Sequence, residues 1–93
     1  MKNYELMYIL MPNLEENDLK AESGSLQKIL TDNGAKITGI NEWGIRDLAY
    51  EIKKQKKGYY VVVNFQSEPV ACQEFTRIVR LDPKVIRFLI TAN

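Results

Sequence analysis

The sequence predicts an α+β fold in which two helices cover one face of a four-stranded antiparallel sheet. Three observations predict it: a length of 93 residues, a globular composition with 45% hydrophobic and 27% charged residues, and the order of the elements along the chain. That order is β-α-β-β-α-β, the ferredoxin-like split βαβ arrangement. We expect residues 1–93 to form a single domain of this kind.

The first strand and helix are predicted from periodicity. Residues 4–11 alternate in direction as in a strand, and both faces are largely apolar. An acidic first turn then begins a helix of about five turns, which Asn33 and Gly34 end. Ser23, Gly24 and Ser25 are poor helix formers, so the continuity of the helix stays open at that point.

The next two strands are expected to form a long hairpin. Residues 36–52 are β-like, with a bulge or bend expected near Gly39. Residues 53–58 are a polar turn, and residues 59–65 are the strongest strand in the chain.

A second helix begins near Pro69 and ends at residues 81–83, and residues 85–91 supply the last strand. The core face of the sheet should then carry alternating large residues from all four strands. These are Leu6, Tyr8, Leu10, Leu48, Tyr50, Val61, Val63, Phe65, Phe88 and Ile90.

Composition argues against catalysis and against a cofactor. The chain has no His, which removes the usual nucleophile pairs and imidazole ligands, and its single Cys72 can form neither an internal disulfide nor a Cys/His zinc site. No phosphate-binding glycine loop and no apolar stretch of membrane-spanning length occurs. We therefore expect a cytoplasmic protein with no metal, no membrane contact and no small-molecule substrate.

The sheet face without helices is expected to be apolar, where polar residues are usual. Alternation places five residues there: Met7, Ile9, Tyr60, Val62 and Leu89. An apolar patch of this kind marks a partner surface, although homodimerisation or a one-residue error in the strand register would also explain it.

Positive charge is concentrated in the second part of the chain. The net charge is only +1, but residues 1–35 carry 3 basic and 6 acidic groups, whereas residues 36–93 carry 10 and 6. Basic residues near strand ends are the candidates for phosphate contact. They are Lys2, Arg46, Arg80, Lys84 and Arg87.

Two classes of binding module remain open on these grounds. RNA-recognition domains share this topology, but residues 57–64 match their third-strand motif only at the start, which makes base stacking in that manner doubtful. A small-molecule-sensing or structural domain is the second class, and an enzyme is a distant third.

A ten-residue motif adds a resemblance to a known family. Residues 44–53, GIRDLAYEIK, fit the pattern G-x-R-D-L-A-Y-x-I-K, and further matches lie at residues 4–5, 12–13, 34–35, 58–60 and 86–88. Over nearly the whole chain, the sequence resembles the bacterial small-subunit ribosomal protein family numbered six.

The resemblance implies a non-catalytic component of the ribosomal platform. Such a protein binds the central domain of small-subunit ribosomal RNA together with small-subunit ribosomal protein eighteen. Within the motif we expect Gly44 at a backbone bend, Leu48, Tyr50 and Ile52 in the core, and Arg46 in a charged contact. The five apolar residues of the uncovered face would then contact the partner protein, and the five basic residues would contact phosphates.

Overall fold

A computed structural model describes residues 1–93 and shows the predicted element order. The elements are β1 (Lys2–Leu10), α1 (Glu16–Asp32), β2 (Lys36–Ile52), β3 (Gln55–Ser67), α2 (Pro69–Val79) and β4 (Val85–Ala92). All strand pairs are antiparallel, and the strand order across the sheet is β2-β3-β1-β4.

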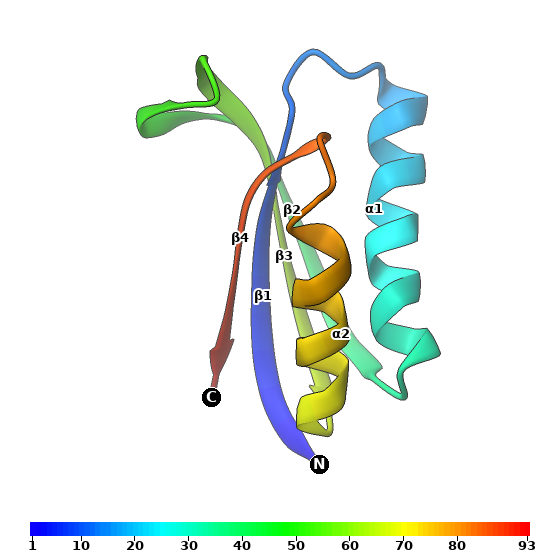
Figure 1. The fold of residues 1–93 in the computed structure, drawn as a ribbon. Helices are drawn as coiled ribbons and strands as arrows, with labels where there is room; N and C mark the ends of the chain where they lie inside the picture. Colours follow the sequence, from blue (N-terminus) through cyan, green and yellow to red (C-terminus); the bar gives the residue numbers. More distant parts are fainter.

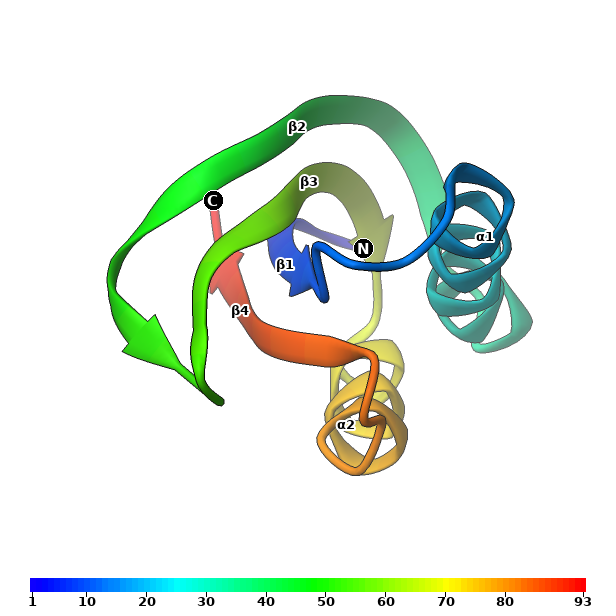
Figure 2. The same ribbon diagram turned by 90° about the horizontal axis from the view of Figure 1, so that it is seen from above.

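Both helices lie on the same side of the sheet, as Figures 1 and 2 show from two directions. The other face carries no helix, and the far end of the β2–β3 hairpin bends toward that side, away from the helices (Figure 1). The predicted α+β, ferredoxin-like fold is thus confirmed. Neither helix has the length and apolar character needed to cross a membrane.

The core lies between the sheet and the helices and contains 14 buried residues. Alternation along β1 and β3 is confirmed, because Leu6, Tyr8 and Leu10 are buried there with Val61, Val63 and Phe65. Phe88 and Ile90 of β4 are partly buried against the same cluster. The helices contribute Leu26, Leu30, Ala71, Phe75 and Val79.

Helix α1 is continuous through the Ser23–Gly24–Ser25 stretch, which resolves the open question about that segment. Ser23 is buried, and its hydroxyl accepts a hydrogen bond from the Tyr8 hydroxyl at 3.0 Å, which satisfies this polar group in the interior. Gly24 faces solvent, and a Cβ there would meet no atom within 4 Å. The helix ends as predicted at Asn33 and Gly34, whose φ of +87° is the left-handed conformation that favours glycine.

The β2–β3 hairpin departs from the prediction in its turn and in its phase. The polar turn is shorter than expected, because only Lys53 and Lys54 have positive φ (50° and 64°), as in a two-residue turn. The pairing of β2 with β3 shifts register between Ile37 and Gly39, as expected, and twice more, between Glu42 and Gly44 and between Asp47 and Ile52.

These additional shifts make the predicted core positions of Leu48, Tyr50 and Ile52 wrong. Each unmatched residue reverses which face the following side chains point to, so simple alternation fails beyond Gly44. Tyr50 is 59% exposed, and Leu48 and Ile52 are half-buried without belonging to the core cluster. The expected backbone bend at Gly44 is present, with φ of +82°.

Candidate nucleic-acid and protein interface

The five apolar residues expected on the uncovered face do share that face. Met7 pairs with Val62 and Leu89, and Ile9 pairs with Tyr60, so their side chains point the same way. Their exposure differs from the expectation, however: Leu89 is 53% exposed, whereas Ile9 (4%) and Val62 (7%) are buried. For these two residues the expectation of an exposed side chain is wrong.

The chain itself covers part of this face. A groove of about 170 Å³ has one wall from the sheet and one from the bent end of the hairpin. The hairpin wall consists of Leu48, Ala49, Tyr50 and Ile52, and the sheet wall includes Met7, Ile9, Tyr60 and Leu89. These four hairpin residues, which belong to the ten-residue motif, therefore lie over the uncovered face of the sheet, although alternation predicted three of them for the core on the opposite face.

Gly58 allows the hairpin to approach β1 closely. A Cβ built at Gly58 would overlap the Cγ2 methyl of Ile9 and would lie 3.5 Å from Cδ1 of Ile86. Both isoleucines are buried, and the branched Ile9 side chain has little rotational freedom with which to move away. A residue without a side chain is therefore required at this crossing.

Arg87 closes the groove at its edge. Its guanidinium donates a hydrogen bond to the Tyr50 hydroxyl, which ties β4 to the hairpin wall. Arg87 is itself exposed and also lines the groove. Arg87 therefore lies at the border between the apolar groove and the positively charged part of the surface.

Three basic side chains converge on a second hollow of about 280 Å³. Lys53 comes from the hairpin turn, Arg80 from the end of α2 and Arg87 from β4. The apolar lining is formed by Val79, Val85, Ile86 and Phe88, and no carboxylate lines the hollow. We call this group of Lys53, Arg80 and Arg87 the cationic cluster.

Lys53 is the member of this cluster that sequence reasoning missed. Lysines at a hairpin tip are ordinarily a solubility feature, and the four in this turn region gave no reason to choose one. In the structure the Lys53 Nζ donates to the Val85 carbonyl oxygen at 3.0 Å, which fixes the turn against the start of β4. Its positive φ directs it there, and no sequence pattern reports that direction.

The remaining predicted basic residues are not all brought together. Lys84 lies in the loop before β4, next to Val85 of the cationic hollow, but it does not itself line that hollow. Its backbone carbonyl accepts a hydrogen bond from the Met11 amide. Arg46 lies on the hairpin arm. Lys2 pairs with Ser67 at the opposite end of β1 and does not join the others.

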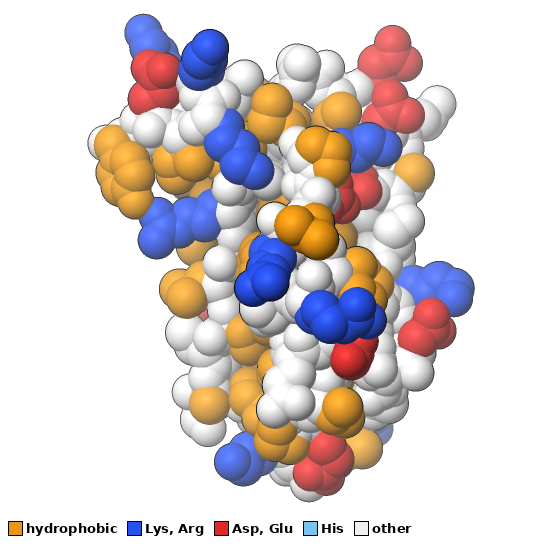
Figure 3. All heavy atoms as spheres, in the orientation of Figure 1, with side chains coloured by type: hydrophobic (Ala, Val, Ile, Leu, Met, Phe, Trp, Pro, Cys, Tyr) orange, Lys and Arg blue, Asp and Glu red, His pale blue; other side chains and the backbone are white.

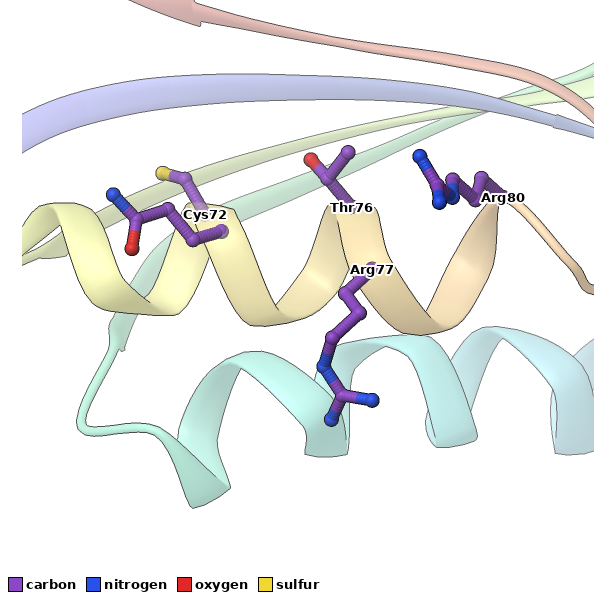
Figure 4. A pocket seen from close by; sticks show the side chains of 5 residues that line it. Cys72, Thr76, Arg77 and Arg80 are labelled. Carbon is purple, nitrogen blue, oxygen red and sulfur yellow. The ribbon is translucent and has the colours of Figure 1, made fainter.

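A further shallow hollow, of about 440 Å³, follows the outer surface of α2 (Figure 4). Cys72, Thr76 and Arg80 project from one side of the helix, whereas Arg77 projects toward α1. Arg77 donates hydrogen bonds to the Glu74 carboxylate, at 3.1 and 2.7 Å. Arg80 lines both this hollow and the cationic one, and no ion pair holds it, so its guanidinium is free to meet an anion.

Basic side chains are prominent on one face of the molecule. In the space-filling view, Lys and Arg side chains lie over α2 and toward the hairpin, and acidic side chains lie at the upper end of α1 and at scattered places elsewhere, including the end of the hairpin (Figure 3). No group of three or more His, Cys, Asp or Glu side chains is close enough to hold a metal ion. The arrangement therefore offers an apolar groove beside a basic surface.

Comparison with known proteins agrees with the motif. A family model described as Ribosomal protein S6 matches residues 3–92. The chain belongs to the ribosomal protein S6 family. It is 45% identical over 93 residues to the small ribosomal subunit protein bS6 of Shouchella clausii, covering 100% of this chain and 98% of that protein. With the bS6 protein of Moorella thermoacetica the identity is 37% over 91 residues, covering 98% and 93%.

Solved structures extend this similarity to three dimensions. The crystal structure of 30S ribosomal protein S6 from Thermotoga maritima matches with a TM-score of 0.94 and 31% identity, covering 99% of this chain and 87% of that one. The C-terminal domain of the MgtC protein from Mycobacterium tuberculosis matches with a TM-score of 0.65 but only 13% identity, which shows a shared fold alone.

Membership of the S6 family confirms the resemblance seen in residues 44–53. It makes this chain a structural component of the small ribosomal subunit and not an enzyme. The expected cytoplasmic, ribosome-associated location follows from the same membership.

Proposed function

We propose that this S6-family chain is a platform component of the small subunit, where it binds the central domain of the ribosomal RNA together with small-subunit ribosomal protein eighteen. One observation carries the proposal: the apolar groove of the uncovered face borders the cationic cluster, and Arg87 belongs to both. A protein partner and an RNA backbone can therefore be engaged side by side.

The groove suits a protein partner. It is formed mostly by hydrophobic side chains from two walls, and Leu89 remains exposed at its edge. Burial of exposed apolar surface against a partner favours the complex, because it removes that surface from water. We assign the partner-facing role to Met7, Tyr60 and Leu89, and a supporting role beneath them to the buried Ile9 and Val62.

The cationic cluster suits phosphates of the RNA backbone. Arg80 and Arg87 carry planar guanidinium groups that match phosphate geometry, and Lys53 adds a third charge at the same hollow. Such contacts fix the position of a protein on RNA and carry little sequence information. With a net charge of only +1, the isolated chain should bind RNA weakly, so we assign much of its hold to the partner protein.

Substitution of exposed leucines tests the protein side of this proposal. Leu89→Glu places a charge at the edge of the groove and should abolish joint binding with protein eighteen to the RNA. Leu81→Glu is the matched control, because Leu81 is also exposed but lies in the loop after α2, away from the groove. Binding is measured by gel shift, with thermal unfolding of both variants as the check on folding. Equal binding by both variants would contradict the assigned interface.

A further inference from the structure

The one tryptophan of the chain is displayed on the hairpin arm and is stacked on another aromatic ring. The rings of Trp43 and Tyr60 are 6.1 Å apart between centroids, with an angle of 10° between their planes. The guanidinium carbon of Arg46 lies 5.5 Å from the centroid of the Trp43 ring. Trp43 is nevertheless 43% exposed, so the stack leaves a large part of the indole in contact with water.

A local irregularity of β2 produces this display. The register shifts between Glu42 and Gly44, which leaves Trp43 as the unmatched residue of a bulge. Gly44 then takes a φ of +82°, a conformation that side-chain-bearing residues rarely adopt. Bulges commonly redirect a side chain toward a binding site, and this one turns a large apolar ring outward beside Tyr60.

A hollow of about 490 Å³ lies against the exposed part of the indole. Its lining consists of Trp43, Ile45, Arg46, Asp47 and Lys57. This set shares no residue with the cationic hollow at Lys53, Arg80 and Arg87. The size lies within the range of roughly 300–1,000 Å³ that is usual for pockets holding small organic groups.

We propose that this hollow, which we call the Trp43 platform, holds one unpaired nucleobase of the RNA. The inference rests on the proposed RNA binding and adds a stacking contact to it. The base would take the place of the Arg46 guanidinium against the indole ring, and the released Arg46 and Lys57 would meet the phosphates on either side of it. Stacking on aromatic side chains and arginine planes is how proteins hold splayed-out bases of single-stranded RNA.

The charges of the platform favour a nucleotide over a hydrophobic protein side chain. Two cations line the hollow, and a purely apolar occupant would leave Arg46 without an anion, since no ion pair holds Arg46 in this structure. Lys57 lies 3.9 Å from the exposed Asp47 carboxylate, a loose pairing that a phosphate can replace. The freed carboxylate then accepts a hydrogen bond from an N–H donor on the edge of the base.

Tryptophan fluorescence tests the platform directly, because Trp43 is the only tryptophan in the chain. The full chain is titrated with the central-domain RNA in the presence of protein eighteen carrying no tryptophan, and the affinity is measured in parallel by filter binding. We expect quenching of Trp43 when RNA is added to the preformed protein pair. We also expect Trp43→Ala to weaken RNA binding by roughly 5- to 150-fold, and Trp43→Phe by much less. Ile40→Ala is the matched control, since Ile40 is exposed on the same strand.

The outcomes separate this inference from the proposed function. If the wild-type pair binds RNA while Trp43→Ala binds equally well and RNA leaves the fluorescence unchanged, the platform is overturned and RNA binding stands. If the partner protein alone produces the full quenching and Trp43→Ala loses the partner first, the platform is a protein contact and the inference is again overturned. If the wild-type pair does not bind the RNA, both the proposed function and the platform are overturned.

Discussion

Arg87 of β4 donates a hydrogen bond to the hydroxyl of Tyr50, 37 residues earlier in the chain, across the edge of the uncovered sheet face. The bond connects the last strand to the bent arm of the hairpin, so it holds the two walls of the apolar groove together. Arg87 also lines the cationic hollow. One side chain therefore links the surface proposed for the protein partner to the surface proposed for RNA.

Removal of the Arg87 charge should change the salt dependence of RNA binding. If Arg87 neutralises one phosphate, Arg87→Ala should reduce the slope of log affinity against log salt by about one unit in the complex with protein eighteen. Tyr50→Phe removes the hydroxyl but keeps the arginine, so the slope should stay unchanged. Lys28→Ala, on the exposed face of α1, is the control for loss of a charge elsewhere. An unchanged slope for Arg87→Ala would remove Arg87 from the RNA contact.

Two glycine substitutions should have opposite effects on stability. Gly58→Ala forces a methyl group into Ile9, and overpacking of this kind costs about 1–3 kcal/mol. Gly24→Ala meets no neighbouring atom in an exposed helix position and should stabilise the fold by about 1 kcal/mol. Urea unfolding midpoints measure both. The double variant Gly58→Ala/Ile9→Ala should lose less stability than the sum of the losses in the two single variants, because the shortened side chain at position 9 leaves room for the new methyl group. Strictly additive losses would contradict the contact.

Tyr8 and Ser23 form a buried hydrogen bond that joins strand β1 to helix α1. Burial raises the pKa of the Tyr8 hydroxyl, so it remains protonated and donates to Ser23. Tyr8→Phe should destabilise the fold by about 1 kcal/mol. Ser23→Ala should cost a similar amount despite its better helix propensity, because the Tyr8 hydroxyl then keeps only a long contact with Gln27 at 3.5 Å. A double-mutant cycle from chemical denaturation checks the pair, and a coupling energy of zero would refute it.

Glu22 should make the fold less stable as the pH rises toward neutrality. Burial raises the pKa of the Glu22 carboxyl from 4.5 to about 7, with a further contribution from Asp82 and an opposing one from Lys84. Between pH 4.5 and 7 the folded chain therefore keeps a proton that the unfolded chain has lost, so the free energy of unfolding falls across this window. Below pH 4.5 and above pH 7 this contribution is constant.

Glu22→Gln isolates this effect, because glutamine cannot titrate. The difference in unfolding free energy between the wild type and Glu22→Gln should shift in favour of the variant as the pH rises from 4.5 to 7. Glu22 Oε2 has no hydrogen-bond partner, so the charged form has little to compensate its burial. Glu16→Gln, in the exposed first turn of α1, is the control. A difference that does not change with pH would contradict the raised pKa.

The sequence predicts the regular parts of this fold well, because alternation and helical spacing report burial directly. β1 and β3 run without a bulge between them from Lys2 to Leu10, so the inward positions of Leu6, Tyr8 and Val63 follow from counting. The same counting fails in β2, where bulges at residues 37–39, 42–44 and 47–52 break the phase. Backbone irregularities are set by local conformation and tertiary packing, and a glycine marks only some of them.

Most single residues of the candidate site can be predicted from the sequence, but the way in which the fold brings them together cannot. Met7, Ile9 and Leu89 follow from strand alternation, but their partial cover by Leu48 and Ile52 depends on the bend of the hairpin. Lys53 joins Arg80 and Arg87 only because a two-residue turn with positive φ directs it toward Val85. Trp43 likewise stacks on Tyr60 only because the bulge beside Gly44 places it there, and strand alternation does not report that placement.

The apolar groove and the adjoining cationic cluster should together impose one property, the dependence of RNA binding on a protein partner. It is tested most directly by the affinity of the isolated chain for the central-domain RNA at physiological salt, measured with and without small-subunit protein eighteen. We predict weak binding alone and at least a tenfold gain when the partner is present, which corresponds to about 1.4 kcal/mol of coupling. Equal affinity with and without the partner would contradict the account.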